Sequence, residues 1–342
     1  MSQTRREFLA GAAGLGALGW VAGCTDRTDG EAAVAFPDPE RPRGMARGLT
    51  LLTLRREGQD RLGVRTERGI LDVPAAARLL GRYAPATLDA LLQEEDGPSV
   101  QALVAAALDS SEAAPAFLPE DQVEYGPLVR HPDKVVCVGL NYRRHAEEIG
   151  AAVPEWPVLF NKFSASLNRH GGTVELPVEH ASQFDYEVEL VIVMGRRARN
   201  VSEADALDHV AGYATGNDFT ARDLQTGRGG QWMIGKAIDG FAPLGPHLVT
   251  ADQVDPDRLA LECRVNGEVR QSSTTADFIF DTRTMVSYIS QFFTLEPGDI
   301  IFTGTPEGVI AGLPPEEQVW LQAGDRIDCS VAGLGELSFH LV

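Results

Sequence analysis

Acidic and apolar residues alternate in the stretch FDYEVEL, residues 184–190. In a strand, residues two apart point to the same side, roughly 7 Å apart, so Glu187 and Glu189 reach out together and Asp185 could join them. The stretch runs on into LVIVMG, which is apolar enough to be buried on both faces. Ionised carboxylates in such a place raise one another's pKa unless a divalent cation lies between them. Carboxylates without thiolate or imidazole select hard ions, so Mg²⁺ is the first expectation, followed by Mn²⁺ or Ca²⁺.

A third ligand is needed to complete such a site, and Asp218 is the best candidate. It follows the strand-like run HVAGYATGN, where small residues let the backbone bend into a loop. Three carboxylates around one Mg²⁺ leave a net charge of about −1, which a single nearby lysine would balance. The residue types alone leave a second interpretation open, in which these acids belong to a solvated strand face that holds no ion.

Two further groups have the residue types for acid–base and electrostatic chemistry. His145 and Glu148 are spaced i, i+3 in RRHAEEIG, so they share a face in a helical turn. A carboxylate beside an imidazole raises its basicity and fixes its tautomer, as a general base requires; the alternative is an incidental pair on a surface helix. Lys236 precedes the apolar run AIDGFAPLGP, a place that favours a buried functional amine, although a lysine paired with a nearby acid fits as well.

The composition narrows the class of protein. The chain has 342 residues and a formal net charge of −19, with acids spread along its whole length. A nucleic-acid partner is disfavoured because phosphates require basic patches, and there is no G-x-G-x-x-G or P-loop motif to cradle a nucleotide. Cys137, Cys263 and Cys329 are far apart in the sequence. They predict neither a zinc site nor a disulfide framework, and are most simply small buried residues.

The N-terminus resembles a twin-arginine export signal, with Arg5–Arg6 before a weakly apolar run rich in Gly and Ala. That run is too short and too rich in Gly to span a membrane well. It ends in Val-Ala-Gly-Cys, which resembles a lipoprotein signal and makes Cys24 the expected lipidated residue; the alternative is an ordinary cleavage site. Residues 1–24 therefore predict export to the periplasm or cell surface, with membrane contact only through the signal or a lipid. Residues 25–45, polar with several prolines, predict a flexible linker.

A small α+β domain is expected over residues 46–125. Short runs of alternating residues predict strands from about residue 46 to 73. Residues 74–108 carry Ala and Leu at helical spacing, interrupted around Pro85 and Gly97.

A strand-rich domain is expected over residues 126–342. Its apolar runs end in Gly, Asn or Pro, and Asn266–Gly267 predicts a hairpin turn that needs positive φ. Helices are expected only over 202–210 and 282–293, with RRHAEEIG as a short helix or mobile loop. The predicted fold class is α+β and rich in β-strands.

Several ordered motifs make residues 130–342 resemble the fumarylacetoacetate hydrolase family. They are CVGLNYRRHAEE (137–148), PVLFNKF (157–163), FDYEVEL (184–190), GYATGNDFTARDLQ (212–225), GKAIDGFAPLGP (235–246) and FTGTPEGV (302–309). The resemblance implies a mixed β-sandwich roll, preceded by a small N-terminal domain and assembled as a homodimer. It also implies a metal held by Glu187, Glu189 and Asp218.

The resemblance implies roles for the remaining candidates. His145 and Glu148 would activate water from a segment that orders when substrate binds, and Lys236 would stabilise developing oxyanion or enolate charge. Residues expected to contact substrate oxygens are Arg222 and Gln225, together with Thr305 and the backbone of Gly304. Arg222 has an alternative role in pairing with a structural acid, and Lys162 is a weaker candidate for the site.

The resulting expectation is a Mg²⁺-dependent enzyme acting on a small 2-oxo or 1,3-dicarbonyl acid. An acylpyruvate-type substrate would be hydrolysed at a carbon–carbon bond to pyruvate and a carboxylic acid. The alternatives on the same site are decarboxylation of an oxaloacetate-like acid, isomerisation of 2-hydroxyhepta-2,4-diene-1,7-dioate, and ureidoglycolate-type lyase chemistry. A non-enzymatic alternative is an exported lipoprotein that binds an oxo-acid without turnover.

Overall fold

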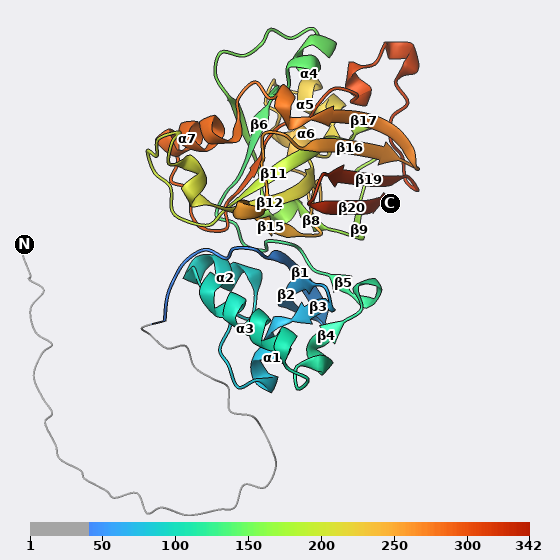
Figure 1. The fold of residues 1–342 in the computed structure, drawn as a ribbon. Coiled ribbons are helices and arrows are strands. Elements are labelled where there is room, and N and C mark those ends of the chain that lie inside the picture. Colours follow the sequence, from blue (N-terminus) through green and yellow to red (C-terminus); the bar gives the residue numbers. More distant parts are fainter. Residues whose placement is uncertain (1–40) are drawn as a thin grey trace, which may run out of the picture. The chain divides into compact units, whose positions relative to one another are not determined.

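The computed structural model describes residues 41–342 (Figure 1). The predicted export signal and Cys24 lie outside the described residues, as does most of the predicted linker. Every helix between residues 41 and 342 is too short or too polar to cross a membrane.

Three antiparallel strands begin the described fold: β1 (Thr50–Arg56), β2 (Gln59–Thr66) and β3 (Gly69–Asp72). β1 pairs over its whole length with β2, from Thr50–Arg65 to Arg56–Gln59. Glu57 and Gly58 between them adopt φ angles of 53° and 75°, as a two-residue hairpin turn requires. The short strands expected in this part of the sequence are confirmed.

Three helices cover these strands: α1 (Val73–Leu79), α2 (Leu88–Glu94) and α3 (Gly97–Asp109). The side chains of Asp72 and Thr87 cap α1 and α2 by accepting a backbone N–H of the first turn at 3.0 and 3.2 Å. The apolar faces of all three helices pack in one core cluster with β1, β2 and β3. The expected interruption around Pro85 is the connection between α1 and α2.

Within residues 41–342 the central sheet contains thirteen strands. Those after β3 are β4 (Phe117–Leu118), β5 (Glu124–Tyr125), β6 (Val135–Gly139), β7 (Val158–Lys162), β8 (Leu167–Arg169), β11 (Val188–Met194), β12 (Val210–Asn217), β14 (Ala242–Leu244), β15 (Leu248–Thr250) and β18 (Ile300–Phe302). The main path runs β4-β3-β2-β1-β15-β12-β11-β18-β6-β7, and the others pair beside it. β1 pairs with β15 through Thr50–Val249 and Leu51–Leu248, so backbone hydrogen bonds join the first strands to the strands that follow.

A second sheet has five strands: β9 (Gly172–Val174), β16 (Ala260–Val265), β17 (Glu268–Thr274), β19 (Arg326–Val331) and β20 (Gly335–Leu341). Their order is β17-β16-β19-β20-β9. The predicted turn at Asn266–Gly267 is confirmed, since both residues have positive φ, 51° and 84°, and connect β16 to β17.

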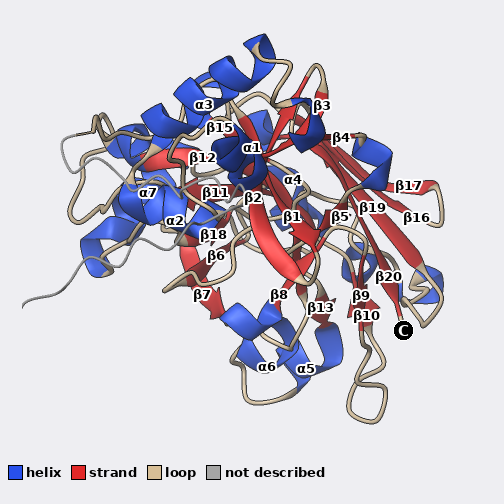
Figure 2. Cartoon of the chain, turned by 90° about the horizontal axis from the view of Figure 1, so that it is seen from below, coloured by secondary structure: helices blue, strands red, loops and turns tan. Residues whose placement is uncertain are grey.

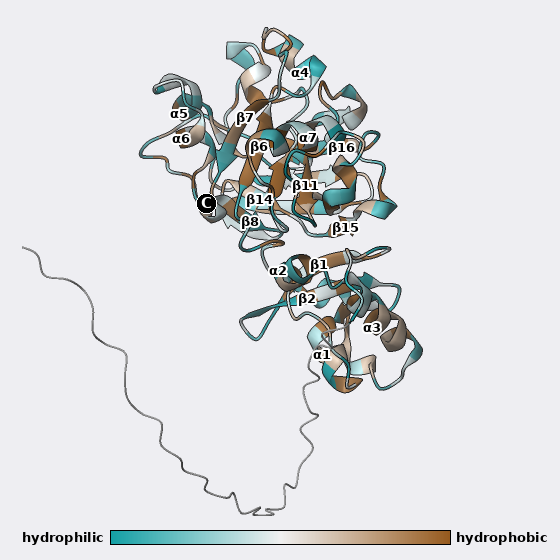
Figure 3. Ribbon diagram, turned by 90° about the vertical axis from the view of Figure 1, so that its left-hand side faces the viewer, coloured by the Kyte–Doolittle hydropathy of each residue, from teal (hydrophilic) through white to brown (hydrophobic). Residues whose placement is uncertain are grey.

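The main hydrophobic core is formed by β11 and β12 of the central sheet, β16, β19 and β20 of the second sheet, and α7 (Thr282–Phe292). β6 and β11 are among the most hydrophobic segments of the ribbon, as Figure 3 shows. α7 confirms the helix expected over 282–293, and its N-cap Asp281 accepts the Thr284 N–H at 2.8 Å.

The prediction of a helix over 202–210 is wrong, because only the 3₁₀ turn Ala206–His209 forms there. Ser202 Oγ donates to Asp205 Oδ2 at 2.7 Å and accepts the Asp205 N–H at 3.3 Å. Such local side-chain hydrogen bonds compete with the helical backbone pattern.

Short elements border the ends of β11 and β12: α4 (Arg143–Glu148), β10 (Phe184–Asp185), β13 (Thr220–Ala221), α5 (Arg222–Gly227) and α6 (Met233–Lys236). Figure 2 shows α5 and α6 next to each other at one end of the molecule. The segment RRHAEEIG contains a helix, α4, which confirms the first of its two expected conformations.

Candidate functional site

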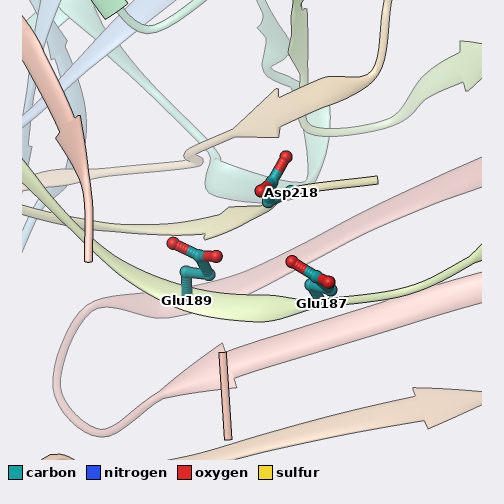
Figure 4. A group of neighbouring side chains, drawn as sticks. All are labelled: Glu187, Glu189 and Asp218. Carbon is teal, nitrogen blue, oxygen red and sulfur yellow. The ribbon is translucent and has the colours of Figure 1, made fainter. Parts of the chain in front are cut away.

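Three buried carboxylates form the centre of the candidate site (Figure 4). Glu187 precedes β11, Glu189 lies on it, and Asp218 directly follows β12. Val188 pairs with Asn217 in the antiparallel ladder, and the Asp218 N–H donates to the Glu187 carbonyl at 2.9 Å. This register brings one oxygen of each carboxylate within 4.8 Å of the others. The predicted convergence of these acids is confirmed.

Two buried lysines contact these acids. Lys236 Nζ lies 2.7 Å from Glu187 Oε2 and 2.8 Å from Asp218 Oδ2. Lys162 Nζ lies 2.6 Å from Asp218 Oδ1, but it donates its hydrogen bonds to the carbonyl oxygens of Phe219, Lys236 and Phe241. Asp218 Oδ1 is therefore a buried acceptor with a positive neighbour and no hydrogen bond of its own.

Asp185 does not join the group of three acids. It accepts Arg222 Nε at 2.8 Å and the N–H groups of Ile310 and Ala311 at 2.9 and 3.1 Å. Arg222 also lies 2.7 Å from Glu187 Oε1. Burial acts to lower the pKa of Arg222, but Asp185 and Glu187 outweigh it and raise that pKa. Arg222 therefore has the alternative role considered from the sequence, as the partner of a structural acid, while also lining the site.

Glu189 is the member of the group that lacks a cation. Its Oε2 accepts the Gly304 N–H at 2.8 Å, and it makes no ion pair with any side chain between residues 41 and 342. Burial, together with the charges of Asp218 and Glu187, raises its pKa well above the ordinary value.

This donor set fits a hard divalent cation. The inner carboxylates, with Asp185, outnumber the nearby cations of Lys162, Lys236 and Arg222 by one. A divalent ion between Glu189 and its two neighbours would supply the missing positive charge, with oxygen ligands that Mg²⁺ and Mn²⁺ prefer. It would also make the site net positive, which suits an anionic ligand.

A histidine–carboxylate pair belongs to the same site. His145 on α4 is buried, and its Nδ1 lies 3.2 Å from Glu148 Oε2. Glu148 Oε1 accepts the Gly308 N–H at 2.9 Å, and a β-carbon at Gly312 would come within 2.4 Å of Glu148 Cδ. The carboxylate is thus held tightly against the imidazole. With the Nδ1 proton directed at Glu148, the Nε2 lone pair is left to accept a proton.

A cavity of about 380 Å³ connects these groups. All the predicted site residues except Glu148 and the weaker candidate Lys162 line it. Sequence reasoning missed several aromatic and amide side chains that also line the cavity, namely Phe160, Gln183, Trp232, Gln318 and Trp320. Phe160 lies on β7, Gln183 just before β10, Trp232 at the start of α6, and Gln318 and Trp320 in the connection before β19, so no single local spacing could have indicated the group.

The residues expected to bind substrate oxygens line this cavity, and several of their polar atoms already make hydrogen bonds within the protein. The Gly304 N–H donates to Glu189. Thr305 Oγ1 donates to the Val188 carbonyl at 3.0 Å and accepts Gln271 Nε2 at 2.9 Å. Gln225 Oε1 accepts an Arg222 N–H at 3.1 Å. Their side chains shape the cavity, and direct contacts with a substrate stay a prediction.

Comparison with known proteins shows which family the chain belongs to. Residues 134–342 match the family model described as "Fumarylacetoacetate (FAA) hydrolase C-terminal". The chain belongs to the fumarylacetoacetate hydrolase family. The predicted α+β, β-rich fold of this family is confirmed with the match.

Relatives within the fumarylacetoacetate hydrolase family differ in their named activities. "Oxaloacetate tautomerase FAHD2A, mitochondrial" from Bos taurus is 46% identical over 220 residues, covering 64% of this chain and 69% of the relative. A crystal structure of a putative HpcE protein from Mycobacterium smegmatis has 37% identity and a TM-score of 0.72, covering 86% of this chain and 99% of the other. Fumarylpyruvate hydrolase from Pseudomonas aeruginosa, in complex with Mn²⁺ and pyruvate, has 38% identity and a TM-score of 0.55, covering 65% and 92%.

Proposed function

We propose that this protein is a divalent-metal-dependent enzyme that interconverts the enol and keto forms of a small 2-oxo diacid of the oxaloacetate type. The observation that carries the proposal is the cavity in which a buried base, His145, faces a metal-binding group of acids. Relatives named oxaloacetate tautomerases support this choice of reaction.

The charges of the site suit such a substrate. Glu187, Glu189 and Asp218 would hold the metal, which would act as a Lewis acid on the substrate carbonyl. Lys236 places its ammonium group against two of these acids, at 2.7 and 2.8 Å. A positive group fixed there stabilises the negative charge that develops when the carbon next to the carbonyl loses a proton.

His145 carries the proton in this proposal. In the keto-to-enol direction its Nε2 accepts a proton from the carbon next to the carbonyl, and the enolate oxygen takes a proton from solvent. In the enol-to-keto direction the enol oxygen gives its proton to solvent, and the protonated Nε2 delivers one to the carbon. Glu148 keeps the ring oriented and stabilises the imidazolium while it holds the proton. Trp232 and Trp320 add aromatic surface to the lining of the same cavity.

Hydrolysis of an acylpyruvate is the second candidate, because the same His145–Glu148 pair can take a proton from water. The hydroxide would add to the distal carbonyl, and cleavage of the carbon–carbon bond would give the enol form of pyruvate and a carboxylate. The fumarylpyruvate hydrolase among the structural neighbours supports this alternative.

Enol absorbance of oxaloacetate tests the proposal directly. We expect its decay to be accelerated by protein with Mg²⁺ or Mn²⁺, above the rate with the metal alone, and to return to the background with EDTA. His145→Ala should lower the protein-dependent rate by about 10²- to 10⁴-fold, and His180→Ala, a change at an exposed histidine, should not.

Three further measurements separate the alternatives. Acetylpyruvate cleaved to pyruvate and acetate, with no effect on the oxaloacetate enol, would favour the hydrolase. Release of CO₂ from oxaloacetate would favour the decarboxylase. Tight binding of either acid without turnover would refute an enzymatic role and favour an oxo-acid-binding protein.

We also propose that two copies of the chain associate along β7. This strand ends the path of the central sheet, and its outer edge pairs with no other strand between residues 41 and 342. Exposed aromatic side chains lie beside it, Phe163 and Phe293 in one surface hollow. Light scattering should give the mass of a dimer, and Phe163→Ser with Phe293→Ser should give monomers; a monomeric wild type would refute the proposal.

Export is proposed from the sequence alone. Arg5–Arg6 and the run that ends at Cys24 support a twin-arginine signal with lipidation. Mass spectrometry of the mature protein should find a lipid on an N-terminal Cys24, and replacing both arginines with lysine should keep the precursor inside the cell. An unprocessed N-terminus in wild-type cells would contradict this proposal.

A further inference from the structure

Two cysteines face each other in the second sheet. Cys263 on β16 and Cys329 on β19 are direct partners in the antiparallel ladder. Their sulfur atoms lie 3.8 Å apart, and both residues are completely buried. The sequence separation of 66 residues gave no sign of this pairing.

The surrounding ladder fixes the two side chains opposite each other. β16 and β19 pair without interruption from Leu261–Val331 to Val265–Ile327. β16 is also held by β17 on its other side, and β19 by β20. Directly opposite residues of such a pair have β-carbons about 4.5–5.5 Å apart, close to the separation of about 3.5–4.5 Å that a disulfide bond spans. Small rotations of the side chains would bring the sulfur atoms to bonding distance.

We propose that Cys263 and Cys329 form a cross-strand disulfide bond when the protein folds under oxidising conditions. The oxidant is a small disulfide such as oxidised glutathione, or a disulfide-bearing oxidoreductase. One cysteine thiolate attacks the oxidant and forms a mixed disulfide, releasing one reduced thiol. The second thiolate attacks the protein sulfur of that mixed disulfide and releases the other reduced thiol. The two protons lost by the cysteines pass to the two released thiols.

The burial of the pair sets when this exchange takes place. A mixed disulfide has no room around two sulfur atoms that are completely enclosed in the core. The bond therefore forms while β16 and β19 are still accessible during folding, and the closed sheet then protects it from reductants.

The proposed bond lies directly behind the metal-binding acids. Asn217 Nδ2 donates to Cys329 Sγ at 3.3 Å, and Asn217 Oδ1 accepts the Glu187 N–H at 3.3 Å. Asn217 thus connects the cysteine pair to the strand end that carries Glu187 and Asp218. A disulfide would tie the second sheet together beneath this connection and stabilise it against local opening.

Cys137 provides an internal control. It is also buried, but it makes no contact with another cysteine among residues 41–342. If oxidation followed burial alone, all three cysteines would behave alike; if it follows the facing geometry, only Cys263 and Cys329 react.

Refolding of the full chain from denaturant tests the proposal. One sample refolds in a mixture of reduced and oxidised glutathione, and the other with excess reductant. After quenching and denaturation, free thiols are alkylated and counted by mass. The chain has four cysteines, so we expect four alkylated thiols in the reduced sample and two in the oxidised one, with peptides containing Cys263 and Cys329 linked.

Stability gives a second readout. Because the closed loop is long, the oxidised wild type should unfold about 5–10 °C higher than the reduced wild type. Cys137→Ala should keep this difference, and Cys263→Ala should abolish it. Four free thiols in the wild type after oxidative refolding, or a bond to Cys137 or Cys24 instead, would overturn the proposal. This result comes from the wild type, so it holds even if one of the variants fails to fold.

Discussion

Replacing Glu189 with glutamine should make the metal-free protein more stable and the metal-loaded protein less so. Glutamine keeps the size of the side chain and can still accept the Gly304 N–H that Glu189 Oε2 accepts at 2.8 Å. The substitution removes only a negative charge. Among the three acids, Glu189 is the one that makes no ion pair within the described residues.

The expected size follows from the spacing of the acids. Oxygens of Glu187 and Asp218 come within 4.8 Å of Glu189. At that distance two like charges repel by about 3 kcal/mol with an effective dielectric constant near 20. Lys236 attracts Glu189 and offsets part of this repulsion, so we expect Glu189→Gln to add about 1–2 kcal/mol to the free energy of unfolding at pH 8 in EDTA.

Saturating metal should reverse this order and make the wild type more stable than Glu189→Gln. A ligand at 100 times its Kd stabilises the native state by about 2.7 kcal/mol. The wild type should gain this amount with Mg²⁺ or Mn²⁺, and Glu189→Gln should gain little, because it has lost a charged ligand. Asp218→Asn should behave differently: it leaves Lys162 without its acid and Lys236 with one, and should cost about 3–5 kcal/mol even without metal.

Urea unfolding of the wild type, Glu189→Gln and Asp218→Asn, each with EDTA and with excess metal, measures these free energies of unfolding. Glu203→Gln removes an exposed acid and should change stability by less than about 0.5 kcal/mol in either condition. The reasoning is refuted if Glu189→Gln is less stable than the wild type in EDTA, or if metal stabilises both proteins equally.

Three further predictions concern the base, its support and a distant histidine. Glu148→Gln should lower turnover about 10²-fold, whereas Glu147→Gln, on the exposed side of the same helix, should leave it unchanged; equal rates for both would exclude the pair from catalysis. Gly312→Ala should displace the Glu148 side chain, 2.4 Å from the added carbon, and lower kcat about 10-fold at an unchanged Tm; a large fall in Tm would show instead that the backbone gives way. Burial lowers the pKa of His247 from 6.5 to about 4, so the unfolded chain binds the extra proton as pH falls below 6.5, and stability should drop by about 2 kcal/mol at pH 5 relative to pH 8. His247→Gln should remove that part of the pH dependence in thermal unfolding, and an unchanged slope would contradict it.

The metal-binding group was predictable because its signals are local. Glu187 and Glu189 follow the two-residue period of a strand, and Asp218 follows a second strand that ends in small residues. The antiparallel register that brings them together is the pairing of adjacent strands of the chain. Local patterns of the same kind gave the hairpin at Asn266–Gly267 and the helix that begins after Asp281.

The roles of other residues depend on partners that are distant in the sequence. Asp185 alternates with the metal ligands, yet apart from the N–H of the adjacent Tyr186 its hydrogen bonds come from Arg222 and from N–H groups more than a hundred residues away. Lys162 appeared to be a weaker candidate, but the fold places its ammonium beside Asp218. The facing cysteines are hidden for the same reason: a register between strands far apart in the chain leaves no trace in spacing.

The hydrogen bonds between β1 and β15 have a consequence for any truncated version of this protein. A fragment starting at residue 134 would contain the whole matched family region but would lose the strand that covers β15. The N–H and C=O groups of Leu248–Thr250 would then form an open template for pairing with other chains, and the apolar residues shared with α2 and α3 would meet water. Such a fragment should aggregate, so the N-terminal strands protect the catalytic part from self-association as well as extending its sheet.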